Sequence, residues 1–190
     1  MKLLFFKNLW IWVFAGLFLG GIVHIVSILL MPHYAEQDTT TRFSATGRVN
    51  EAYVLPQVEA GKSPYTFADP NAAYAICPYD ITLAPLRIRV ESGVNYLLMV
   101  FLGTGGSSFY ALSDKASSNG AMDIRLADAD QMNEIELLDT EDDLVRELRV
   151  RAPQPKGIVL LRSVFSNALE RGQAVERVKG FKCGLETIGG

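Results

Sequence analysis

The chain has 190 residues, of which 49% are hydrophobic and 21% charged, and its formal net charge is −3. This composition excludes a disordered or low-complexity chain, and the length is typical of one folded domain with additional segments. The acidic balance excludes a basic nucleic-acid-binding surface, because phosphate contacts need such a surface. The two histidines, His24 and His33, both lie in or beside the apolar N-terminal segment. We therefore expect no metal site and no cofactor.

Residues 9–31 contain no charged side chain and predict one transmembrane helix. About 20 apolar residues are enough to cross the hydrocarbon core of a bilayer. A cleaved signal peptide is the alternative, but its apolar region usually has only about 7–15 residues and ends at a small-residue cleavage site. Lys2 and Lys7 are the charged side chains among residues 1–8, and basic residues favour the cytoplasmic side of a membrane. We expect a single-pass protein with residues 1–8 in the cytoplasm and residues 33–190 outside it.

One face of the predicted membrane helix carries small and polar residues, which are Gly16, Gly20, His24 and Ser27. Small residues four apart let two helices approach closely, and a polar residue at membrane depth needs a partner. This face predicts helix packing, either in a homodimer or with another membrane protein. The alternative is that glycine is simply common in membrane helices and that His24 reaches water at the outer interface.

Residues 32–72 are expected to form a helical or irregular connection, with a short helix over 38–46 that ends at Gly47. Residues 73–190 predict a β-rich domain, because apolar and polar residues alternate in several short segments. The continuous apolar segment 96–102 predicts a strand that is buried on both faces. The expected strands cover residues 86–90, 96–102, 109–112, 122–126, 148–151 and 158–161, and the expected helices cover 129–138 and 171–179. The predicted fold is mainly β (α+β), an antiparallel β-sandwich-like domain with a few short helices after the membrane helix.

Cys77 and Cys183 are the two cysteines of the chain. In an exported domain they meet oxidising conditions, which favour a disulfide. Two separate buried thiols are the alternative.

Candidate catalytic groups are few. Beyond position 33 the predicted exported domain contains no histidine that could act as a base and activate a nucleophile. Asp80 and Asp114 remain as a carboxylate pair beside predicted strands, and two carboxylates can hydrolyse a glycosidic bond at a suitable spacing. A hydrogen-bonded structural role for each is the alternative. Asp128 and Asp130 begin like a calcium loop, but Met132 and Asn133 replace a ligand and the required glycine, so a solvated acidic surface is favoured.

Five arginines occupy the outward positions of alternating strands. If these strands share one sheet, the guanidinium groups would line one face that binds anionic glycans or phospholipid head groups. The alternative is a solvated face that Asp123 and Glu147 neutralise. The residues are Arg87, Arg89, Arg125, Arg149 and Arg151.

Several motifs resemble one bacterial family. They are Cys77-Pro-Tyr-Asp-Ile81, Pro85-Leu-Arg-Ile88, Phe109-Tyr-Ala-Leu-Ser-Asp114 and Ala152-Pro-Gln-Pro-Lys-Gly157 with Leu161-Arg162. From about Leu9 to Cys183 the chain resembles the short, membrane-anchored form of the bacterial domain-of-unknown-function family 1254 (DUF1254). The resemblance implies an inner-membrane protein with a β-rich periplasmic domain and a companion protein of family 1214 as partner. It also implies recurrent polar positions, which match Tyr79, Asp80, Asp114 and Arg162.

These observations favour an envelope interaction or scaffold module in the bacterial inner membrane over an enzyme. Its expected partners are the lipid bilayer, the family 1214 companion and a second copy through the membrane helix. Two alternatives stay open, an envelope carbohydrate-active enzyme that uses paired carboxylates and a binder of anionic glycan or lipid.

Overall fold

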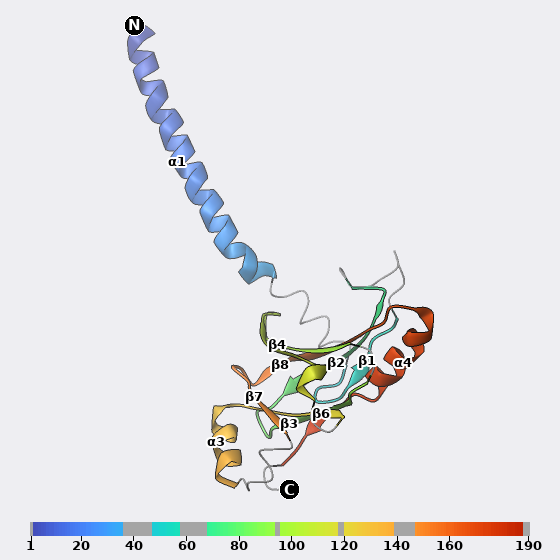
Figure 1. Ribbon diagram of the computed structural model, residues 1–190. Coiled ribbons are helices and arrows are strands. Elements are labelled where there is room, and N and C mark those ends of the chain that lie inside the picture. The colour runs from blue at the N-terminus through green and yellow to red at the C-terminus, as the bar shows by residue number, and fades with distance from the viewer. Residues whose placement is uncertain are drawn as a thin grey trace. The chain divides into compact units, whose positions relative to one another are not determined.

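A computed structural model describes residues 2–35, 47–57, 68–93, 96–117, 120–138 and 147–187 (Figure 1). The chain divides into two compact units, Met1–Asp38 and Thr39–Gly190. The first unit contains α1 (Lys2–Ala35), which includes the expected span at residues 9–31 with a mean hydropathy of 2.4. The helix expected over residues 38–46 lies outside the described residues.

The second unit contains two β-sheets that face each other. In the five-stranded sheet the order is β1 (Tyr53–Val54), β2 (Ala72–Asp80), β8 (Lys156–Val164), β4 (Leu97–Gly103) and β5 (Ser108–Ser113). In the four-stranded sheet the order is β7 (Leu148–Arg151), β6 (Ala121–Ala127), β3 (Leu86–Glu91) and β9 (Lys182–Leu185). The mainly β, α+β fold expected from the sequence is confirmed. The strand pairing is mostly antiparallel, and one pair, β6 with β7, runs parallel.

The core lies between the two sheets and explains the alternation in the sequence. Inward side chains of β3, such as Leu86, Ile88 and Val90, are buried together with inward side chains of β4, such as Met99 and Phe101. The expectation that β4 is buried on both faces is wrong. Its side chains alternate between buried and half-buried, because the described residues bury one face of this sheet more fully than the other.

β2 is a strand that the sequence pattern does not reveal, since it is rich in alanine and contains Pro78. Proline lacks a backbone donor and is tolerated in a sheet only at an edge or an irregularity. Pro78 meets this condition because β1 pairs with β2 only at Ala75 and Ile76, and beyond that point the Pro78 carbonyl accepts a hydrogen bond from Asn50 N (2.7 Å). The expected connection over residues 32–72 therefore contains β1, and part of it belongs to the β domain.

Two helices of the second unit lie to the left and right of the strands in Figure 1. α3 (Ala129–Leu138) buries Ile135, and α4 (Ala168–Lys179) buries Ala174 and Val178 against the core. α4 begins after Asn167, whose side chain accepts hydrogen bonds from two backbone N–H groups, and it ends at Gly180 as expected. A short 3-10 helix, η1 (Asp114–Ala116), follows β5.

A disulfide joins the two sheets through the core. It links Cys77 in β2 to Cys183 in β9, with the two Cα atoms 6.5 Å apart and 106 positions between them in the sequence. The expected pairing of the two cysteines is therefore present in the structure.

Candidate functional site

The arginine-bearing strands share one sheet, as the anion-binding hypothesis requires. Arg87 pairs in register with Arg125, and Arg125 pairs with Arg149 across the parallel strand β7. Arg89 lies two positions after Arg87 on β3, and Arg151 lies two positions after Arg149 on β7. All five arginines therefore lie on the outer face of the four-stranded sheet, opposite the core.

Asp123 on β6 neutralises two of these arginines. Arg87 donates two hydrogen bonds to it, from Nε to Oδ1 and from Nη2 to Oδ2, both at 2.9 Å. Arg89 donates to Oδ2 from Nε at 2.8 Å, and its Nη2 lies 2.6 Å from the same oxygen. Burial opposes ionisation of Asp123, but these hydrogen bonds outweigh it and hold the pKa of Asp123 below its usual range.

Two further carboxylates extend the ion pairs along the face. Glu186 Oε1 lies 2.5 Å from Arg87 Nη1, and Glu186 Oε2 lies 3.5 Å from Arg125 Nη2. Glu147 bridges Arg125 at 3.2 Å and Arg149 at 3.0 Å. The hydrogen bonds to Asp123 and then to Glu186 raise the pKa of Arg87 above its usual value. Most of the arginine charge on this face is therefore paired with carboxylates. This agrees with the alternative to anion binding, in which acidic residues neutralise the face.

A hollow of about 300 Å³ lies at the β9 edge of this face. Gly184 pairs with Arg87 in register, and a Cβ atom added at Gly184 would find no atom within 4 Å. The side chains of Arg87, Arg89, Lys182 and Glu186 line the hollow around this glycine. The sequence gives little indication of this arrangement, because β9 has only four residues and shows no long alternation.

The four recurrent polar positions do not form one site. Tyr79 is buried in the core over Gly157, where a Cβ atom would lie 2.5 Å from the phenol oxygen. Burial raises the pKa of Tyr79 to about 12. Arg162 lies on the opposite, outer face of the same sheet and forms an ion pair with Asp69 (2.5 Å).

Asp80 and Asp114 lie at opposite corners of the five-stranded sheet. Asp80 ends β2, where the β8 strand begins at Lys156, whereas Asp114 follows β5 beside the first residues of β4. Three strand spacings and the length of β4 place them roughly 25 Å apart. This separation exceeds the roughly 5–10 Å between paired glycosidase carboxylates, so the two residues do not form the expected catalytic pair.

The surroundings of Asp80 give it a structural role. Its Oδ1 accepts hydrogen bonds from the hydroxyl (2.5 Å) and backbone N–H (3.1 Å) of Thr82, and its Oδ2 lies 3.1 Å from Lys156 Nζ. The hydrogen bonds from Thr82 and then from Lys156 hold the pKa of Asp80 below its usual range.

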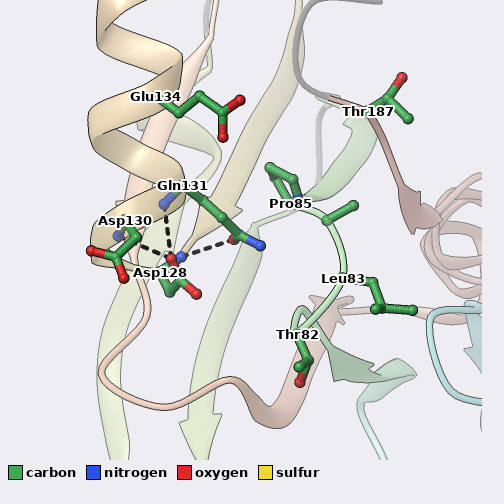
Figure 2. Close-up of a pocket in the computed structure, with 9 residues that line it drawn as sticks. Thr82, Leu83, Pro85, Asp128, Asp130, Gln131, Glu134 and Thr187 are labelled. Carbon is green, nitrogen blue, oxygen red and sulfur yellow. Dashed lines mark hydrogen bonds between the residues drawn. The ribbon is translucent and has the colours of Figure 1, made fainter.

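The acidic segment that begins at Asp128 is a helix cap (Figure 2). Asp128 Oδ1 accepts from the backbone N–H groups of Asp130 (3.0 Å) and Gln131 (2.9 Å), and Gln131 Oε1 accepts from Asp128 N (3.2 Å). Gln131 Nε2 also donates to the Ile81 carbonyl (2.7 Å) and so ties α3 to the β2–β3 loop. This is a capping box, in which a side chain at each end satisfies a backbone donor of the other. Within the described parts of the chain, no group of three or more His, Cys, Asp or Glu side chains is placed to hold a metal ion.

The outer face of the five-stranded sheet is mostly apolar, although Arg162 lies on it between Tyr74 and Leu98. Leu55, Ile76 and Ile158 form a small buried cluster there. Half-buried apolar side chains continue the face, and they are Tyr74, Leu98, Val100, Leu102 and Leu160.

The predicted packing face of α1 is open. A Cβ atom added at Gly16 or Gly20 would meet no atom within 4 Å beyond the helix's own backbone, and His24 and Ser27 are exposed. The packing role of this face and its partner both stay predictions.

Comparison with known proteins identifies a fold. The structure is similar to the VPA0106 protein from Vibrio parahaemolyticus, with a TM-score of 0.56 and 12% identity over 80% of this chain and 35% of that chain. An uncharacterised protein from Burkholderia cenocepacia aligns with a TM-score of 0.46 and 13% identity, over 82% of this chain and 39% of that chain. The chain thus spans little more than a third of the length of these proteins. No protein-family model and no curated protein matches it, so the resemblance to family 1254 stays a prediction. At 12% identity, the likeness to VPA0106 shows that the two proteins share this sandwich fold.

Proposed function

We propose that this protein is a single-pass protein of the bacterial inner membrane whose periplasmic β-sandwich is an interaction module for other envelope proteins. The apolar span of α1 supports the anchor, and Lys2 and Lys7 before it support a cytoplasmic N-terminus. The disulfide between Cys77 and Cys183 supports an oxidising compartment for the domain.

The apolar outer face of the five-stranded sheet is the observation that carries the interaction role. A contiguous apolar surface on a soluble domain marks a contact with another molecule, because leaving it in water costs roughly 25 cal/mol per Å². The half-buried side chains of Leu98, Val100 and Leu102 on β4 lie on this face, next to the central strand β8. The separation of Asp80 and Asp114 favours this role over glycoside hydrolysis.

The partner that the family resemblance suggests is a separately encoded protein of family 1214. A second copy of this chain, packed through Gly16 and Gly20 of α1, is the partner that the membrane helix suggests. The first partner would meet the outer face of the sandwich, and the second would meet the small-residue face of α1 in the bilayer.

Site-specific photocrosslinking in intact cells tests the interaction role. A photoreactive amino acid at Val100 is expected to give a discrete crosslinked species, whose second protein is identified by mass spectrometry. The same amino acid at Lys115, an exposed residue of η1, is the matched control and should give no such species. Equal crosslinking from both positions, or none from Val100, would contradict the proposal.

A further inference from the structure

We propose that the hollow at Gly184 binds a phosphate group. Its charged walls are Arg87 and Arg89 of β3, Lys182 of β9 and Glu186, and its volume is about 300 Å³. These side chains belong to a sheet face on which the fold places like charges next to each other.

Arg89 and Lys182 are direct cross-strand partners in register. Two like charges in this position destabilise a sheet unless an anion lies between them. Arg89 uses Nε and Nη2 for Asp123, and its remaining nitrogen, Nη1, has no hydrogen bond to any described residue. Lys182 is exposed and forms no ion pair within the described ranges. Within the described part of the chain, the pair therefore has unused donors, and both residues line the hollow.

The carboxylates near the hollow do not satisfy these donors. Asp123 and Glu186 are both held by Arg87, which uses all three of its guanidinium nitrogens for them. Glu91 lies two residues after Arg89 and lines a separate hollow with Lys182, without forming an ion pair to it. Three cations thus border the hollow, and two of them have donors that no described residue satisfies.

The size and charge of the hollow fit phosphate. Gly184 forms its floor without a side chain, so a group the size of a tetrahedral anion can approach the strand. A phosphate group can accept hydrogen bonds from Nη1 of Arg89 and from the ammonium of Lys182 at once. The phosphate can be a free anion or the head group of a lipid.

Calorimetric titration of the full chain in uncharged detergent with inorganic phosphate at low ionic strength tests this proposal. We expect saturable binding to the wild-type protein. Arg89→Gln and Lys182→Gln should each raise the Kd about tenfold, the loss of one charge-assisted hydrogen bond. Gly184→Glu should abolish binding, because it fills the hollow and adds a carboxylate. Lys115→Gln removes the same charge elsewhere and should leave the Kd unchanged.

The proposal is overturned if phosphate shows no saturable binding, or if Lys115→Gln weakens binding as much as Lys182→Gln does. Lys182 is exposed and unbonded within the described ranges, so a folding defect in that variant is not expected, and unchanged circular dichroism verifies this. Parallel titration with glycerophosphoglycerol identifies the source of the phosphate. Tighter binding of this diester supports the site and indicates a lipid head group, and tighter binding of inorganic phosphate supports it and indicates a free anion.

Discussion

At Gly157 the addition of a single methyl group should have a large effect on the stability of the domain. It lies between β2 and β4, and a Cβ atom there would collide with the Leu102 carbonyl and the Tyr79 hydroxyl. We expect Gly157→Ala to destabilise the domain by about 1–3 kcal/mol, because a backbone carbonyl cannot move aside without distorting the sheet. Chemical denaturation measures the change. Gly172→Ala is the matched control in α4, where a Cβ atom has open space, and it should stabilise the domain by about 0.5–1 kcal/mol.

Asp123 should make the stability of the domain depend on pH in the acid range. Its pKa in the folded protein is lowered, so its contribution is complete above the unfolded pKa of about 3.9 and is lost as the pH falls through the folded value. Asp123→Asn should therefore be less stable than the wild type at pH 7, and the difference should shrink below about pH 4. Denaturation midpoints from pH 7 to pH 2 provide the measurement. A difference that stays constant over this range would show that the charge of Asp123 is not the cause.

At the level of single elements, the capping box of α3 explains an acidic segment that resembles a cation loop. Asp128→Ala should destabilise the domain by about 1 kcal/mol, because two backbone N–H groups at the start of α3 lose their acceptor. Asp128→Asn should retain most of the stability, since asparagine caps helices about as well as aspartate does. Thermal unfolding of both variants distinguishes the cap from a purely electrostatic role, in which the two substitutions would cost the same.

The strands in which apolar and polar residues clearly alternate could be predicted from the sequence. Elements that form for other reasons could not. β3 and β6 alternate because one face of each is buried and the other carries charges. β2 escaped prediction because only its pairing with β8 and the short β1 makes room for Pro78. The parallel pairing of β7 depends on a chain crossing that local patterns do not encode. The hollow at Gly184 depends on the register between β3 and β9, which brings together residues almost 100 positions apart.

For the whole molecule, the disulfide holds the two sheets together. A link across 106 positions restricts the unfolded chain, and its removal is expected to cost up to about 4–5 kcal/mol. Denaturation with and without reductant measures this cost in the wild-type protein, and the Cys77→Ala/Cys183→Ala double variant should be insensitive to reductant. If reductant lowers the stability of the wild type and of the double variant equally, the effect does not come from this bond.

The position of the bond in the chain also sets an order of events during synthesis. Cys77 leaves the ribosome long before Cys183, which lies in β9, the last strand in chain order. Cys77 therefore stays without its disulfide partner until nearly the whole sandwich has been made, and covalent closure of the sandwich must follow the synthesis of β9. Arrested or truncated products would retain this reactive sulfur, which gives thiol-trapping reagents and cellular quality control a chemical mark of the incomplete protein.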